Sequence, residues 1–407
     1  MIDSGLSSYI HAYDNVRLHP DRKLSANEIV AANAINWAGI KEFSQARATS
    51  YYFPFIYAPQ AIGLVLGEAF GFSIDKSYRL ARLLALLVSS LLACVAFLIY
   101  PPSPLVGALL IIPMSLFQFS SASLDGISTA MSIFAISLFM RIVDERDDAK
   151  SWRLYGLTAS VILVVSSRPH LVPLISLIFG TYLYTGNKKS LFAGGVALSS
   201  VLLWWTVAIR GTSGTRLAIQ TYPRAPISTI ISYYVADPFS FLTILHTTFS
   251  HYGRPYFESF LGILGWLDAR FTEEIYTSFL YFLLTIGMFS VSFRCVKQEL
   301  PARMLLTLCA LLSFILVFPA VLLTNGHPAS IIEGVQGRYF LISALLLSYS
   351  LLCNARRASC RSYVVGFVLL SVLLLYSTFH TTTLLLKRYY VSPEQALTLE
   401  NHETALP

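Results

Sequence analysis

The sequence predicts an all-α integral membrane protein, a polytopic helical bundle of about 10 transmembrane helices plus an outer interfacial helix. Of its 407 residues, 55% are hydrophobic and only 13% are charged, whereas a soluble domain carries about a quarter charged residues. The apolar residues also gather in long runs, as membrane-spanning helices require. A single soluble domain would have too little polar surface to cover it, and is excluded.

Ten apolar runs account for the predicted spans, although several are shorter than the ~20 residues that cross a bilayer. They cover approximately residues 83–100, 105–119, 127–140, 154–166, 171–185, 191–209, 275–293, 304–323, 340–353 and 363–379. These runs divide the chain into an outer N-terminal segment with an interfacial helix (1–82), a first transmembrane part (83–209), a long extracytoplasmic segment (210–274), a second transmembrane part (275–380) and a polar tail (381–407).

The stretch 54–72 is apolar but also contains Pro59, Gln60 and Glu68. It could cross the membrane, which would make residues 1–50 cytoplasmic, or lie along the outer surface as an interfacial helix. We favour the surface helix. In both arrangements Arg79 and Arg82, which precede the first strong span, lie outside, so their charges do not decide between the two.

Lys and Arg residues are distributed unevenly between alternate loops, which predicts the orientation. One set of alternate loops, here the first set, holds Arg141, Arg146, Lys150, Arg153, Lys188, Lys189, Arg294, Lys297, Arg303, Arg356, Arg357 and Arg361. The short loops of the other set contain only Arg168 and Arg338. The first set is therefore expected in the cytoplasm, and the turns around Asp125, Arg168 and Arg338 face outward. The net charge of +7 is not concentrated in a free basic arm, so nucleic-acid binding is disfavoured.

Four local patterns resemble one family of bacterial membrane proteins, and they occur in the family's order. They are YYFPFIYAPQAIGLVLG at 51–67, PMSLFQFSSASLDG at 113–126, LGWLD at 264–268 and GVQGRYF at 334–340. The chain is similar to the family called domain of unknown function 2142 (DUF2142), which looks like a branch of the GT-C glycosyltransferases. The resemblance implies a GT-C-like fold in the bacterial cytoplasmic (inner) membrane. It also implies transfer of a sugar from a polyprenyl-phosphate carrier to a cell-surface glycan.

The chain departs from the family at its start. Members usually begin with a further transmembrane helix, followed by an outward Asp-Glu motif and a nearby His. Residues Asp3, His11 and Asp14 occupy the neighbouring region but do not reproduce this motif. We therefore expect either a start codon set too far downstream or a truncated member, with the dominant catalytic carboxylate upstream of residue 1.

Glycosyl transfer from a lipid phosphate needs a carboxylate that deprotonates or orients the acceptor hydroxyl, and cations that neutralise the leaving phosphate. A divalent cation can share the second task, but no metal ligands are predicted. Asp125 is a candidate for the carboxylate. The alternative is a helix cap, because it follows three serines at the start of a span.

Arg338 and Arg168 are the candidate phosphate ligands. Arg338 lies in a Gly-rich turn with Tyr339, where Glu333 and Gln336 would contact sugar hydroxyls. Arg168 precedes Pro169 and His170 between two apolar runs, and His170 is counted with the substrate-binding residues. The alternative is that both arginines and Tyr339 are interfacial anchors, and that His170 is a hydrogen-bonded turn residue.

The long outer segment supplies a second candidate carboxylate, Asp268, beside Trp266, whose ring suits stacking on a sugar. The alternative is an amphipathic lid resting on the headgroups. His246 and His251 are five residues apart, which fits poorly the i, i+4 spacing of zinc ligands.

The predicted function is therefore that of a membrane glycosyltransferase, whose partners are the polyprenyl-phosphate-sugar donor, the glycan acceptor and the bilayer. A lipid-linked glycan flippase or transporter is an alternative, which would need polar residues through the middle of the membrane. A non-catalytic scaffold in cell-envelope polysaccharide assembly is another.

Overall fold

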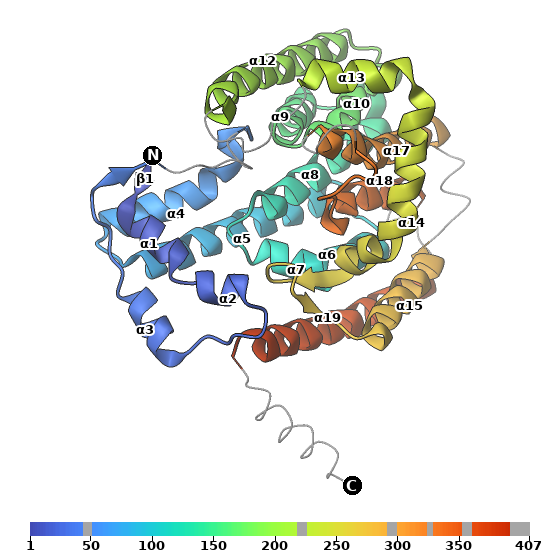
Figure 1. Ribbon diagram of the computed structural model, residues 1–407. Coiled ribbons are helices and arrows are strands. Elements are labelled where there is room, and N and C mark those ends of the chain that lie inside the picture. Colours follow the sequence, from blue (N-terminus) through green and yellow to red (C-terminus); the bar gives the residue numbers. More distant parts are fainter. Residues whose placement is uncertain (44–50, 218–225, 291–298, 324–328, 352–359, 391–407) are drawn as a thin grey trace.

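In the computed structural model, the described residues are 1–43, 51–217, 226–290, 299–323, 329–351 and 360–390, and most of them are helical (Figure 1). This confirms the predicted all-α class. The loop residues Arg294, Lys297, Arg356 and Arg357, the ends of two predicted spans and most of the predicted tail lie outside the described residues.

The N-terminal segment forms three short helices beside the bundle, α1 (Ser4–His11), α2 (Asp14–Leu18) and α3 (Ala26–Asn33). An antiparallel pair, β1 (Ile2–Asp3) and β2 (Lys41–Glu42), closes it. The Asp3 carboxylate accepts hydrogen bonds from the backbone of Gly5, Ala38 and Gly39. These bonds satisfy amides at both ends of the segment and hold its two ends together.

The stretch 54–72, predicted to be a surface helix, contains a 3-10 turn η1 (Pro54–Tyr57) and helix α4 (Ala58–Ala69), which folds back on α5 (Ile74–Ile99). Its location at the membrane surface stays a prediction. Helix α5 begins at Ile74, well before the predicted start at residue 83. Ser73 precedes it, and the acidic Asp75 lies in its first turn, where a negative charge is favourable. A Cβ atom at Gly63 would lie 2.4 Å from the Cα atom of Ala81. Glycine is therefore what allows the two helices to approach so closely.

The run 105–119 is not one continuous span, which corrects the prediction. It forms two helices of seven residues each, α6 (Pro104–Leu110) and α7 (Pro113–Phe119). Ile112 between them is extended (φ −61°, ψ 153°), as expected for a residue that precedes proline. Each piece is about 10 Å long at 1.5 Å per residue, far shorter than a bilayer.

Helix α8 is the central element of the bundle. It spans Leu124–Glu145 and is followed by η2 (Arg146–Asp148), α9 (Ser151–Ser167), η3 (Pro169–Leu174), α10 (Ile175–Gly180), α11 (Tyr182–Thr185) and α12 (Lys189–Leu217). Within its apolar window 83% of α8 is buried, against 17% for α5, and α5 and α9 both pack on it. The predicted span 171–185 is divided among η3, α10 and α11.

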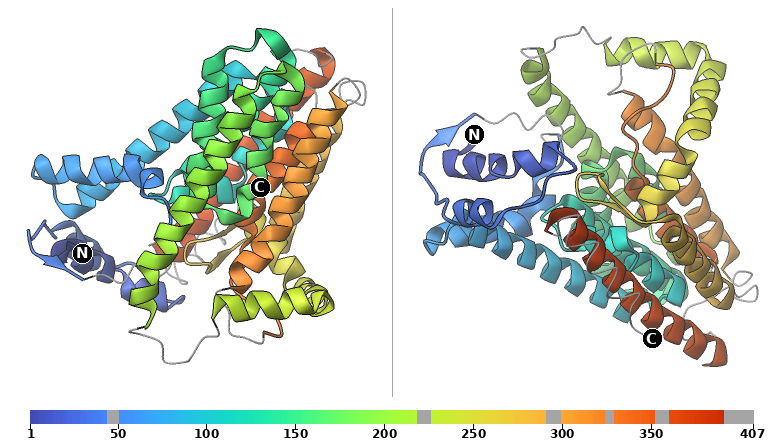
Figure 2. Two further views of the ribbon diagram at one scale, coloured as in Figure 1. Left: turned by 90° about the horizontal axis from the view of Figure 1, so that it is seen from above. Right: turned by 60° about the horizontal axis from the view of Figure 1, so that its bottom comes forward.

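The second half of the chain encloses α8 from the other side (Figures 1 and 2). Its elements are α13 (Ile227–Ala236), α14 (Pro238–Gly262), β3 (Ile263–Leu264), β4 (Ala269–Arg270), α15 (Glu273–Ser290), α17 (Leu300–Leu322), η4 (Gly337–Phe340), α18 (Leu341–Leu351) and α19 (Cys360–Tyr389). Helix α19 continues to Tyr389, so the predicted polar tail 381–407 begins as helix. The predicted outer segment 210–274 contains α13, α14 and the β3–β4 hairpin.

Five helices of the described part are long and apolar enough to cross a membrane: Ile74–Ile99, Leu124–Asp148, Lys189–Arg210, Leu300–Leu322 and Val364–Tyr389. The protein is therefore a multi-pass membrane protein by helix length and composition, while the predicted number of about ten spans is not confirmed. The orientation stays a prediction from the loop charges.

The close contact of α4 and α5 gives a testable consequence. Gly63→Ala should lower stability by about 1–3 kcal/mol, because the new methyl group overlaps the backbone of Ala81. Gly195→Ala in α12 is the matched control, since a Cβ atom there meets nothing within 4 Å, and helix propensity predicts a gain of up to about 1 kcal/mol. Thermal unfolding of the purified protein in detergent measures both. Equal melting temperatures for the two variants would contradict this packing.

Candidate functional site

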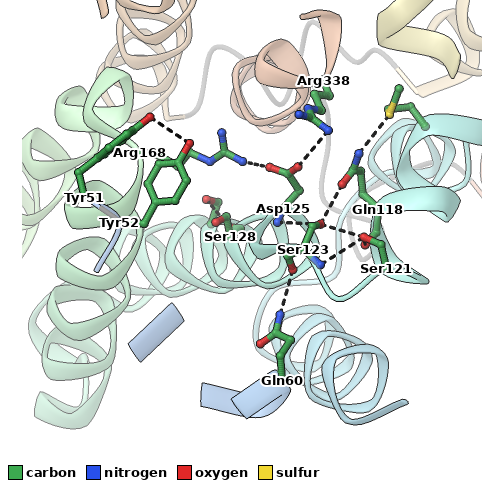
Figure 3. A network of polar contacts seen from close by, with 12 residues as sticks. Tyr51, Tyr52, Gln60, Gln118, Ser121, Ser123, Asp125, Ser128, Arg168 and Arg338 are labelled. Carbon is green, nitrogen blue, oxygen red and sulfur yellow. Dashed lines mark hydrogen bonds and ion pairs between the residues drawn. The ribbon is translucent and has the colours of Figure 1, made fainter. Parts of the chain in front are cut away.

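Asp125 lies in the first turn of α8, with its carboxylate turned toward two arginines (Figure 3). The residue that caps the helix is Ser123, whose Oγ accepts a hydrogen bond from the backbone N of Asp125 at 3.3 Å. The cap predicted for Asp125 is thus made by its neighbour. The side chain of Asp125, 17% exposed, remains available for other contacts.

Arg168 is the closer of the two arginines to the carboxylate of Asp125. It follows the last residue of α9 and is only 8% exposed, and its Nη2 pairs with Asp125 Oδ1. Burial lowers the pKa of Arg168 from its ordinary value, and the negative charge of Asp125 offsets that cost. A snorkelling anchor would point to the headgroups, whereas this guanidinium points into the bundle.

Arg338 approaches the same carboxylate from the second half of the chain. Its Nη1 lies 3.8 Å from Asp125 Oδ2, and its side chain is 31% exposed. Among the described residues, no hydrogen-bond partner reaches its Nε. Gly337 permits this approach, because a Cβ atom there would lie 2.1 Å from the backbone N of Phe260 in α14. The Nε of Arg338 therefore remains an unused donor within the described part of the chain.

Two glutamines join the serine turn to the charged residues. When the Gln118 amide is turned over from its orientation in Figure 3, its nitrogen lies 2.9 Å from Asp125 Oδ2 and its oxygen 3.3 Å from Arg338 Nη1. Gln60 of α4 donates to the backbone O of Ser123 at 2.9 Å. Three segments, α4, α7 and the start of α8, are thereby fixed around Asp125.

Aromatic rings surround the arginines. The guanidinium of Arg168 lies 5.8 Å from the ring centre of Tyr52 and 5.5 Å from that of Tyr339, within the range of cation–π attraction. His170 is buried beside Tyr339, with ring centres 6.4 Å apart. Burial, with the nearby charge of Arg168, lowers the pKa of His170 to about 3, so its ring is neutral at physiological pH.

The predicted residues Asp125, Arg168, His170, Arg338 and Tyr339 line one cavity, together with Gln118, Ser128, Thr129, Leu341 and Ile342. Its volume is about 20 Å³, which is room for about one water molecule. In this conformation the polar side chains therefore fill the site by contacting one another.

The other predicted residues lie elsewhere. Asp268 Oδ2 pairs with Arg388 Nη2 of α19 at 2.5 Å, and Oδ1 accepts from the backbone N of Trp266 at 2.9 Å. Arg388 also donates to the backbone O of Arg22 and Val16. Asp268 thus joins the β3–β4 hairpin, α19 and the N-terminal segment, and does not line the Asp125 cavity.

Three further predicted residues also stand outside that cavity. The ring of Trp266 is 66% exposed and stacks with the guanidinium of Arg17 at 5.1 Å. Glu333 is exposed in the segment before η4. Gln336 directly precedes η4, and its Oε1 is buried without a hydrogen-bond partner among the described residues.

Sequence reasoning missed Gln118, Gln60 and Tyr52 as members of the site. All three lie in the patterns 51–67 and 113–126, and a glutamine inside an apolar run is a usable signal, because a buried amide needs partners. Among the described residues, no group of three or more His, Cys, Asp or Glu side chains could hold a metal ion.

The comparisons agree with this reading of the patterns. A family model described as "Predicted membrane protein (DUF2142)" matches residues 23–347, which is most of the chain. The chain therefore belongs to this family. Comparison with curated proteins and with solved structures found no significant match.

The two arginines should differ in their effects on stability. Arg168→Gln removes one partner of a buried ion pair and should cost about 3–5 kcal/mol. Arg338→Gln should cost less than about 1 kcal/mol, because its contact with Asp125 is longer and partly exposed. Thermal unfolding in detergent compares the two variants. If both lose the same amount, Arg168 is not the structural partner of Asp125.

The buried neutral His170 predicts acid sensitivity. Its pKa lies below the unfolded value, so between about pH 6.5 and pH 3 the unfolded chain binds a proton that the folded chain does not. Stability should fall with falling pH in this window by up to about 1.4 kcal/mol per pH unit. His170→Gln should flatten the slope of the melting temperature between pH 6.5 and 5. An unchanged slope would show that other groups cause it.

Proposed function

We propose that this DUF2142 protein transfers a glycosyl unit from a polyprenyl-phosphate-linked donor to a cell-surface glycan at the outer face of the membrane. One observation carries the proposal: a carboxylate, Asp125, stands between two guanidinium groups at one end of an apolar bundle. This arrangement supplies the charges that the reaction needs, close to where a lipid headgroup would lie.

The two arginines take different roles in the proposed site. Arg338 is the phosphate ligand, because it is partly exposed and its Nε has no partner among the described residues. A guanidinium with free donors can make a forked contact with phosphate oxygens. Arg168 is a positioning residue, which orients Asp125 through their buried pair.

Asp125 is the proposed base or orienting group for the acceptor hydroxyl. The donor phosphate would compete with Asp125 for Arg338, whose 3.8 Å contact is the weaker of the two. Breaking that contact would leave Oδ2 with only the neutral Gln118 amide beside it and able to accept from the acceptor hydroxyl, while Arg168 holds Oδ1. Because the cavity has room for only about one water, the site must open before a sugar can enter.

The sugar would be held by residues around η4. Gln336 keeps an unpartnered Oε1 among the described residues, an acceptor for a sugar hydroxyl, and Glu333 stands nearby in sequence. Asp268 is left out of the proposed site, because Arg388 and the backbone of Trp266 already occupy its oxygens. Trp266 remains a candidate for acceptor stacking at the surface.

The transport alternative receives less support from α8. Its charged residues lie only near its two ends, at Asp125 and from Arg141 to Glu145. The hydroxyl of Ser132 in its middle donates back to the backbone O of Ser128, and Ser137 contacts Tyr349. These groups are satisfied within the protein, whereas a transport path needs polar groups available at mid-membrane.

The experiment measures sugar transfer from radiolabelled polyprenyl-phosphate sugars by the full chain in vesicles. Asp125→Asn should lower turnover by about 10²–10⁴, as for loss of a general base, and Arg338→Ala by about 10²–10³, as for loss of a transition-state donor. Arg254→Ala is the matched control, because this exposed arginine pairs with Glu258 and Glu273 and does not line the Asp125 cavity.

Three results are distinguishable. Undiminished turnover in both site variants would reject the site. No turnover by the wild-type chain with any donor tested would reject the enzyme and favour the non-catalytic scaffold. Loss of turnover in Arg254→Ala as well would mean that the variants report folding.

A further inference from the structure

A second polar site lies at the other end of α8. Helices α5, α8 and α9 enclose an open groove of about 280 Å³ there, on the side of the bundle where α5 and α9 pack against α8 (Figure 1). The groove is lined by Val95, Leu98, Ile99, Arg141, Trp152 and Arg153. Arg141 is sixteen positions beyond Asp125, about 24 Å along the helix, so the two sites are separate.

The charged side chains that line the groove are both positive. Both Arg141 and Arg153 pair with Glu145, Arg141 through Nη2 at 2.7 Å from Oε1, so two guanidinium groups share one carboxylate. The described lining itself contains both arginines and no carboxylate. An anion that entered the groove would therefore meet two guanidinium groups and no carboxylate of the lining.

Arg153 adds an unused donor at the base of the groove. It is only 9% exposed, and within the described chain its Nε has no hydrogen-bond partner. A buried donor without a partner is costly and is rare in folded proteins. An anionic oxygen in the groove would supply the missing acceptor.

The other wall of the groove is apolar and open to the surroundings. On α5, Leu98 is 77% exposed and Val95 is 44% exposed, and this helix is one of the candidate membrane spans. Trp152 is 48% exposed, with the guanidinium of Arg153 at 5.5 Å from its ring centre. Tryptophan and arginine beside exposed leucine are typical of the boundary between headgroups and acyl chains.

We propose that this groove binds an anionic glycerophospholipid of the bilayer, with its phosphate at Arg141 and Arg153 and an acyl chain along Val95 and Leu98. A free phosphate would satisfy the arginines but would leave the apolar wall uncovered. A zwitterionic lipid would bring a second, positive group to a lining whose charged side chains are both arginines. The inference is independent of the proposed glycosyl transfer.

The test uses the fluorescence of Trp152, which lies in the groove. The full chain is reconstituted in phosphatidylcholine vesicles in which a minor fraction is brominated phosphatidylglycerol or, separately, brominated phosphatidylcholine. Subtracting the signal of Trp152→Phe isolates quenching at Trp152 from that at the other four tryptophans. The apparent affinity of the groove for brominated phosphatidylglycerol, measured by quenching of Trp152, should exceed that for brominated phosphatidylcholine by roughly fivefold for each arginine contact.

Arg141→Gln should lower this preference by about fivefold, and Arg141→Lys should retain it. Arg79→Gln is the matched control, because Arg79 is an exposed arginine near the opposite end of α5, and it should leave the preference unchanged. Equal quenching by the two brominated lipids, or no effect of Arg141→Gln, would overturn the proposal. Relief of quenching by millimolar inorganic phosphate would also overturn it, since the groove would then recognise the anion and not the lipid.

Discussion

The ion pair between Asp125 and Arg168 is the contact on which the candidate site depends. Charged groups inside an apolar bundle are costly unless each has a partner, and Arg168 is nine-tenths buried. The start of α8 and the end of α9 must therefore meet at this point. Once they do, this charge pair is a fixed point for the surrounding segments. The turn at Ser123, the residues of η4 and the ring of Tyr52 all pack around it.

Breaks in the apolar elements bring the polar residues to that point. Pro113 interrupts the run 105–119, and the resulting short helix α7 presents Gln118 beside Asp125. Gly337 lets η4 contact the backbone of α14, which places Arg338 opposite. In both cases a residue with special backbone properties allows irregular structure, and side chains of neighbouring elements satisfy the polar groups that the break exposes.

Helix α8 also separates two electrostatic environments. Near its beginning, the carboxylate of Asp125 lies between the buried Arg168, which contacts it closely, and the partly exposed Arg338, which is farther from it. Near its end, two arginines share Glu145. The buried middle of the helix holds no charged residue. A rigid helix of this length keeps the two environments apart, which allows the two proposed sites to act on different ligands.

The sequence by itself determined the helical class, the family and the residues at the turns, because apolar runs and local patterns are properties of neighbouring residues. It also indicated that Asp125, Arg168 and Arg338 belong together. The tertiary structure decided which charges pair: Asp125 with Arg168, and Asp268 with Arg388, 120 residues away. It also showed that runs 105–119 and 171–185 are broken. Such outcomes depend on the packing of segments that are distant in sequence, because a buried charge without a partner is costly and only packing decides which partner is near. Hydrophobic periodicity reflects neighbouring residues and therefore does not predict these pairs.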